Sequence, residues 1–161
     1  MLFRSEPTAG VDPKARRDFW DQIHALAAEG ITVLVSTHYM DEAERCHELA
    51  YIAYGRLLAR GTEPEIVAGA ALAVRELRGA GLQALVPRLK AAPGVLSVAA
   101  FGHALHVAAR DAGAVEAAVA AVMPAGAGEG SLTVRPVDAS LEDVFISLIG
   151  LAPDNAGPTA R

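Results

Sequence analysis

The chain has 161 residues and a net charge of −5, with no basic run, which argues against a general nucleic-acid binder. Its one cysteine, Cys46, cannot form an internal disulfide and fits a reducing compartment. No segment has about 18 consecutive apolar residues, so no membrane span is predicted, and the start, MLFRSEP, lacks the apolar core of a secretion signal.

The first part of the chain alternates short apolar segments with helical patterns. Asp12 and Pro13 favour a helix start, as N-cap and first helical residue, and Gly30 favours its end. The other predicted elements are a strand at 1–3, a strand at 31–36, a charged helix at 40–48, strands at 49–54 and 56–59 joined at Gly55, and a helix opened by the capping box of Thr62 and Glu65. Strands that alternate with helices indicate an α/β layer.

From about Gly69 the pattern changes to a second unit. The predicted elements are a strand at 72–77, a helix at 82–89, strands at 95–101 and 105–109, a helix at 112–122, a strand at 131–137 and a helix at 141–149. The order βαββαβ is that of a split βαβ, ferredoxin-like domain. We therefore predict an α/β domain over 1–68, a small α+β domain over 69–150 and a flexible tail over 151–161.

Two motifs in the first domain suggest chemistry. Residues 6–13 read EPTAGVDP, and the apolar run ITVLVSTH ends in His38. Ligands of open α/β sheets bind beyond the carboxyl ends of the strands, so Glu6 and His38 are typical of the second half of a nucleotide-hydrolysis site. The first half, G-x-x-x-x-G-K-[ST], is absent, because the two lysines, Lys14 and Lys90, follow proline and leucine.

Simpler interpretations of these residues stay open. Glu6 could be a surface glutamate at a turn, His38 a cap of the next helix, and Gly10 and Asp12 a turn and a helix cap. The acidic residues at 41–44 are fully explained by the dipole of a helix N-terminus.

The remaining titratable residues form no visible site. The other histidines are predicted to be surface or hydrogen-bonded residues: His24, His47, His103 and His106. In the second domain nothing titratable is expected to cluster. Asp138, Glu142 and Asp143 look like charges at the end of the last helix, with Ser140 as its N-cap.

In their order and spacing, these motifs resemble the ATP-binding subunits of ABC transporters. The resemblance is strong over residues 1–62, and the segment RPVDASLEDVFISLIG at 135–150 is similar to the end of the C-terminal domain of ABC-2 type exporters. It implies a partial P-loop NTPase sheet followed by the ferredoxin-like domain. It also implies roles: Glu6 orients or deprotonates the attacking water, His38 contacts the γ-phosphate, and Ala9, Gly10, Val11 and Asp12 form a loop at a dimer interface.

The chain departs from the family at Arg4 and Ser5, where the family has Leu-Asp. The aspartate helps to hold Mg²⁺, and the uncharged hydroxyl of Ser5 would contribute much less. A guanidinium in a central parallel strand is costly. We expect Met1 to be a chance start after a truncation rather than part of a tuned variant.

The resemblance implies that the intact protein couples Mg²⁺-ATP hydrolysis to export. It would work with a membrane subunit and a second ATP-binding subunit, at the cytoplasmic face of the cell membrane. The isolated chain is expected to bind no ATP. Two alternatives stay open: a non-enzymatic interaction module and a decayed gene product. Residues 1–65 are expected to expose apolar strand faces, with residues 70–150 more robust.

Overall fold

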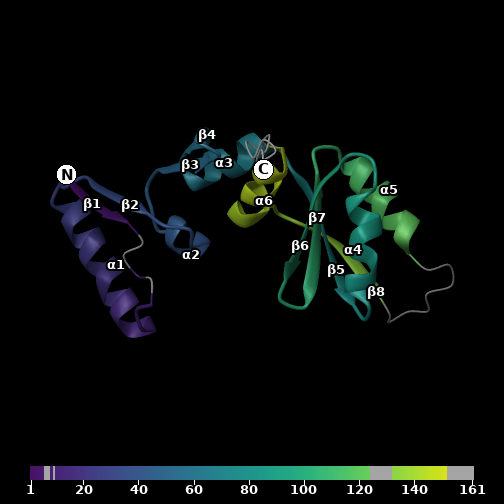
Figure 1. Cartoon of the computed structure of the whole chain (residues 1–161), viewed down its shortest axis with the longest axis horizontal. Helices are drawn as coiled ribbons and strands as arrows, with labels where there is room; N and C mark the ends of the chain where they lie inside the picture. The colour runs from purple at the N-terminus through teal and green to yellow at the C-terminus, as the bar shows by residue number, and fades with distance from the viewer. Residues whose placement is uncertain (6–7, 9, 124–131, 152–161) are drawn as a thin grey trace, which may run out of the picture. The chain divides into compact units, whose positions relative to one another are not determined.

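A computed structural model of the chain describes residues 1–5, 8, 10–123 and 132–151. It divides into two compact units, Met1–Cys46 and His47–Arg161 (Figure 1). The mixed α/β class with open sheets is as predicted. The domain boundary at 68/69 stays a prediction, and all but the first residue of the predicted tail lies outside the described residues.

The first unit contains a pair of parallel strands connected by a helix. β1 (Leu2–Ser5) pairs with β2 (Val33–Ser36), so that Ser5 lies opposite Ser36. Between them, α1 (Pro13–Ala28) begins where Asp12 Oδ1 accepts hydrogen bonds from the backbone N–H groups of residues 14 and 15, at 3.0 and 3.1 Å. It ends before Gly30, whose φ of 84° suits glycine. Both predicted ends of this helix are confirmed.

The next helix is much shorter than predicted. α2 covers only Met40–Ala43, not 40–48. The backbone N–H groups of Arg45 and Cys46 donate to the carbonyls of Glu42 and Ala43, three residues back, at 3.1 and 2.9 Å. This tighter turn replaces the i−4 bonds that would continue an α-helix.

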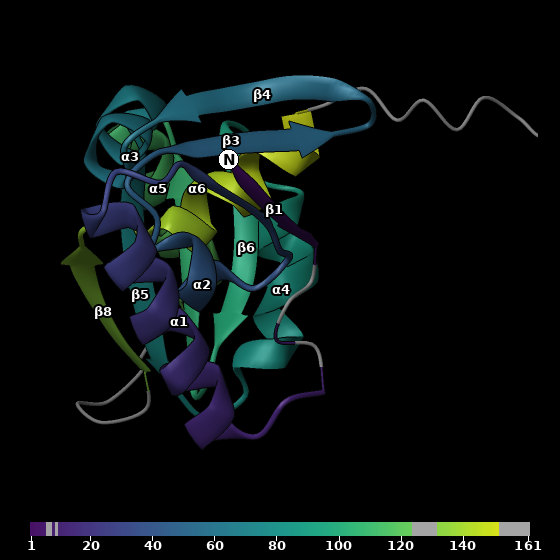
Figure 2. The same cartoon turned by 90° about the vertical axis from the view of Figure 1, so that its left-hand side faces the viewer.

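The second unit begins with the predicted hairpin. β3 (Leu49–Ala53) and β4 (Arg56–Gly61) are antiparallel (Figure 2). Tyr54 and Gly55, between them, have φ values of 52° and 71°, the two left-handed residues that a type I′ turn requires. α3 (Glu63–Ala70) follows with its capping box formed. The hydrogen bonds from Thr62 lower the pKa of the Glu65 carboxyl.

A four-stranded sheet forms the rest of the second unit. Its elements are β5 (Ala73–Gly79), α4 (Leu82–Lys90), β6 (Val95–Phe101), β7 (Ala104–Ala109), α5 (Ala112–Val122), β8 (Leu132–Val137) and α6 (Leu141–Leu151). The strand order is β6-β7-β5-β8, with every neighbouring pair antiparallel. The assignment of this domain as a split βαβ, ferredoxin-like domain stays a prediction.

The two faces of this sheet are covered differently. On one face α4 and α5 pack over the main core, which includes Leu77, Leu105, Val107 and Val115, each at most 2% exposed. Burial of each such side chain contributes about 1.5–3 kcal/mol. On the other face α6 packs against β6 and β7, and it also contacts α3 (Figure 1). α6 therefore connects the four-stranded sheet to α3, which precedes that sheet in the chain.

Candidate functional site

The parallel pairing of β1 and β2 brings their carboxyl ends to one edge. His38 lies two residues beyond β2 and is exposed, with its ring centroid 4.1 Å from that of Tyr39. Glu6 and Ala9 lie outside the described residues, and only the backbone of Ser5 is described. The structure thus places His38 two residues beyond Ser36, which pairs with Ser5 of β1, and the contact predicted between Glu6 and a nucleotide stays a prediction.

The loop before α1 has the simpler roles that the sequence allowed. Gly10 has a φ of 72°, and the N–H of Val11 donates to the carbonyl of Thr8 at 3.2 Å, which closes a turn. Asp12 caps α1. Val11 is 37% exposed. The turn and the cap are confirmed, and the role of residues 9–12 at a dimer interface stays a prediction.

A buried polar contact joins this loop to α2. Thr8 is 1% exposed and Glu42 is fully buried, and the hydroxyl Oγ1 of Thr8 donates to Oε1 of Glu42. The second carboxylate oxygen, Oε2, has no hydrogen-bond partner among the described residues. The interpretation of the acidic residues at 41–44 as simple helix-dipole charges is therefore wrong for Glu42. Its carboxylate fixes the segment after Glu6 to the helix that follows His38.

Arg16 of α1 supplies the positive charge nearest to this carboxylate. Its Nε is 3.8 Å from Oε1 of Glu42, and its Nη1 is 3.7 Å from Oδ2 of Asp41. The guanidinium carbon also lies 5.1 Å from the centre of the Tyr39 ring, within the range of a cation–π contact. A buried carboxylate is costly without such a partner, so Arg16 offsets part of that cost.

Cys46 is not an activated nucleophile. Burial raises the pKa of its thiol, and the nearby Glu42 carboxylate raises it further. The thiolate is the reactive form, so a raised pKa disfavours reaction at this sulfur.

The second unit contains a cluster of charged residues that the sequence analysis did not predict. Nε of Arg78 and Nε of Arg135 each donate to Oε1 of Glu76 at 2.6 Å. These hydrogen bonds, first from Arg78 and then from Arg135, lower the pKa of the Glu76 carboxyl to about 2. The expectation that nothing titratable clusters in this part of the chain is wrong.

His106 connects this cluster to α6. Its Nδ1 is 3.0 Å from Oδ1 of Asp143, its Nε2 is 3.7 Å from Oε2 of Glu76, and its ring stacks on Phe101. Asp143 is 1% exposed and also accepts hydrogen bonds from the N–H and hydroxyl of Ser140, at 2.9 and 2.7 Å. The Ser140 cap and the hydrogen-bonded state of His106 are confirmed, whereas Asp143 is more than a helix-end charge.

Register explains how these residues meet. Glu76 lies opposite His106 on β7 and opposite Arg135 on β8, so the three side chains share one face of the sheet. That is the face on which α6 lies. Nothing in the local sequence around any of the three residues shows this pairing.

The described residues do not fit a complete site for Mg²⁺ and a triphosphate. Among residues 1–5, 8, 10–123 and 132–151, no group of three or more histidine, cysteine, aspartate or glutamate residues could hold a metal ion. A phosphate cradle needs a glycine-rich loop with a lysine, and neither Lys14 nor Lys90 belongs to one. Within the same described part of the chain, every helix is too short or too polar to cross a membrane.

The α/β fold is compatible with the resemblance to ABC transporter ATP-binding proteins, and comparisons with known proteins agree with that resemblance. Nod factor export ATP-binding protein I of Ralstonia nicotianae is 39% identical over 153 residues, which cover 93% of this chain and 46% of that protein. The protein of the same name from Rhizobium sp. (strain N33) is 34% identical over 152 residues, with shares of 93% and 47%.

A shorter match points the same way. The probable multidrug ABC transporter ATP-binding protein YbhF of Escherichia coli (strain K12) is 46% identical over 71 residues, or 44% of this chain and 12% of that protein. No family model matches the chain. The chain belongs to the ABC transporter ATP-binding proteins. It spans about half the length of the Nod factor export relatives.

Proposed function

We propose that this chain is part of an ATP-binding subunit of an ABC export system. In the intact protein, Glu6 orients or deprotonates the water that attacks the γ-phosphate of Mg²⁺-ATP, and His38 contacts that phosphate. Phosphoryl transfer depends on positioning and on charge neutralisation more than on covalent chemistry, so a carboxylate and a histidine at adjacent strand ends suit it. The names of the relatives, which refer to Nod factor export and to multidrug transport, support export.

The hydrogen bond between Thr8 and Glu42 is the observation that carries this proposal. Thr8 is two residues after Glu6, and Glu42 is four residues after His38. A buried contact at this point holds the two segments together beyond the parallel strands. A hydrolysis site needs that rigidity, because a small displacement of a reacting group costs much of the rate.

The isolated chain should neither bind nor hydrolyse ATP. A triphosphate at the ends of β1 and β2 would meet the carboxylates of Glu6 and Asp12 without a lysine to neutralise it. Calorimetric titrations of the chain with ATP, in the presence and in the absence of Mg²⁺, are expected to show no heat of binding that depends on Mg²⁺. Stoichiometric binding that depends on Mg²⁺, or turnover abolished by Glu6→Gln, would contradict the proposed inactivity of the isolated chain.

The proposed partners are a membrane subunit and a second ATP-binding subunit, at the cytoplasmic face of the cell membrane. The loop of residues 9–12, in which residues 10–12 are exposed, would contribute to contact with the second subunit. Val11→Cys offers a test, because its side chain is 37% exposed. A disulfide or short cross-link from this position to a full-length ATP-binding subunit would support the contact, and cross-linking no better than from Glu29→Cys, at the other end of α1, would argue against it.

The β3–β4 hairpin favours a second candidate function, a non-enzymatic interaction module. Ile52 and Leu57 lie opposite each other on adjacent strands and are 66% and 59% exposed. Exposed apolar pairs of this kind are typical of surfaces that contact another chain. Co-purification of the chain with a full ATP-binding subunit, without turnover and lost in Ile52→Ser/Leu57→Ser, would favour this function.

A further inference from the structure

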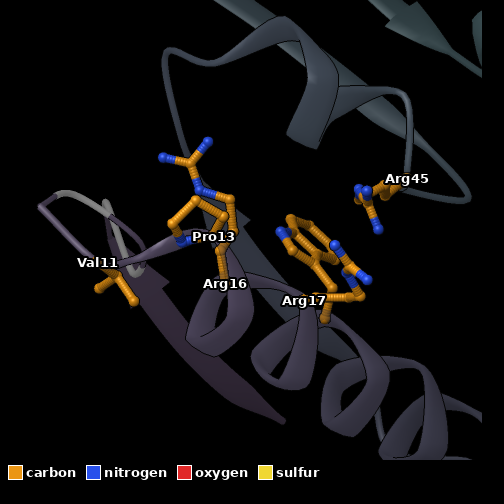
Figure 3. Close-up of a pocket in the computed structure, with 6 residues that line it drawn as sticks. Val11, Pro13, Arg16, Arg17 and Arg45 are labelled. Atoms are coloured by element: carbon orange, nitrogen blue, oxygen red, sulfur yellow. The ribbon is translucent and has the colours of Figure 1, made fainter.

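We propose that the first unit contains a binding site for a phosphate-type oxyanion, separate from the proposed nucleotide site. The site is a pocket of about 250 Å³ lined by Val11, Pro13, Arg16, Arg17, Trp20 and Arg45. Figure 3 shows the arginines around it, with Arg16 and Arg17 carried by α1 and Arg45 by the segment after α2. All six residues belong to Met1–Cys46, so the pocket forms within one compact unit.

The charge of this pocket is unusual for the chain. Three arginines line it, and among the residues that the structure describes no acidic one does, although the protein as a whole has a net charge of −5. Arg17 and Arg45 are exposed, and neither guanidinium forms an ion pair with a carboxylate of the described residues. Like charges around one small pocket repel each other, and a bound anion would remove that repulsion.

The available donors match a tetrahedral oxyanion. Guanidinium groups present planar pairs of N–H donors that suit phosphate and carboxylate oxygens. Arg16 is held only by ion pairs of 3.7 and 3.8 Å, to Asp41 and Glu42, so part of its hydrogen-bonding capacity remains available. Nε of Arg16 and Nε1 of Trp20 are buried and have no hydrogen-bond acceptor among the described residues.

Size and charge favour phosphate over other ligands. Pockets for drug-sized molecules usually have about 300–1,000 Å³, and this one is smaller. The three guanidinium groups attract a phosphate, which carries two negative charges, more strongly than they attract a carboxylate, which carries one. The source of the phosphate can be the free ion or a phosphate monoester on a protein or small molecule, since each presents at least three phosphate oxygens to hydrogen-bond donors.

Trp20 makes the proposal directly testable, because it is the only tryptophan of the chain and it lines the pocket. Inorganic phosphate, O-phosphoserine and acetate are titrated separately into the full chain while its fluorescence is followed. EDTA and constant ionic strength exclude effects of Mg²⁺ and of general screening. We expect a saturable change with inorganic phosphate, and a tighter response to O-phosphoserine would identify a monoester as the preferred source.

The matched variants are Arg17→Gln/Arg45→Gln in the pocket and Arg56→Gln in β4, an exposed arginine outside it. The double variant should weaken phosphate binding by about tenfold or more, since two charge-assisted contacts are lost. Arg56→Gln should bind as the unchanged protein does. The proposal is overturned by no fluorescence or ³¹P NMR response to phosphate, by equal binding of acetate, or by unchanged affinity in the double variant.

Discussion

The hydroxyl of Thr8 donates a hydrogen bond to the carboxylate of Glu42, and both side chains are almost completely buried. These residues are 34 positions apart, yet each closely follows one of the two parallel strands. Their contact fixes the loop after β1 to α2. The contribution of this contact to the stability of the first unit can be measured without any nucleotide.

Replacement of Glu42 should destabilise the first unit. Glu42→Ala leaves Thr8 without its acceptor and Arg16 without its nearest buried partner, and a lost charge-assisted hydrogen bond costs about 1.5–3 kcal/mol. We expect the free energy of unfolding to fall by this amount in urea denaturation followed by Trp20 fluorescence.

The control for that experiment is the exposed neighbour Glu44. Glu44→Ala should change the free energy of unfolding by no more than about 0.5 kcal/mol, as surface substitutions usually do. Equal effects of the two substitutions would show that Glu42 contributes only through the helix dipole, as the sequence alone suggested.

The stability of the second unit should depend on pH through Glu76. Its pKa is lowered from 4.5 to about 2 in the folded state by hydrogen bonds from Arg78 and Arg135. A lowered carboxyl pKa stabilises the folded state above the unfolded pKa, and this contribution is lost as the pH falls from about 4.5 towards 2. Urea midpoints measured by circular dichroism should therefore decrease over this range.

Glu76→Gln removes the titrating group and serves as the comparison. The variant should be less stable than the unchanged protein at neutral pH, and its urea midpoint should fall less steeply between pH 4.5 and 2. Identical slopes for the two proteins would mean that Glu76 titrates normally and that its two arginine contacts do not persist in solution.

Asp143 should anchor α6 to the sheet. It accepts hydrogen bonds from His106 and from Ser140, 37 and 3 residues away. Asp143→Ala removes both, and we expect amide hydrogen exchange in α6 to become faster by about tenfold or more. Glu142→Ala, at the exposed neighbouring position, should leave the exchange rates nearly unchanged, and similar acceleration in both variants would contradict this role.

Local signals were sufficient for most of the secondary structure. The helix at 112–122 has the bounds that were predicted, and the Gly55 turn and the Thr62 and Ser140 caps form as expected. Each depends on residues within a few positions of one another. The predicted extension of α2 to residue 48 was wrong because the turns at Arg45 and Cys46 compete with a weak, charged helix.

The polar contacts could not be predicted in the same way. Glu42 and Asp143 lie in the first turns of helices, where acidic residues are favoured for local reasons alone. Their partners are 34 and 37 residues away, and Arg135 is 59 residues from Glu76. Only the strand order and register bring these groups together. The parallel pairing of β1 and β2, which the α/β pattern does predict, was the one signal that could have suggested the contact of Thr8 with Glu42.

The contact of Tyr51 with Phe145 should hold the β3–β4 hairpin against α6. The two rings stack with centroids 4.2 Å apart and planes 16° from parallel, and such pairs contribute about 0.5–1.5 kcal/mol beyond burial. Tyr51→Ser should therefore favour opening of the hairpin and raise the rate of trypsin cleavage at Arg56 and Arg60 by about two- to tenfold. The control is Ile52→Ser, since Ile52 is the next residue of the strand and is 66% exposed. Cleavage that is faster in the control than in Tyr51→Ser would show that the hairpin is held by its own strand pairing and not by α6.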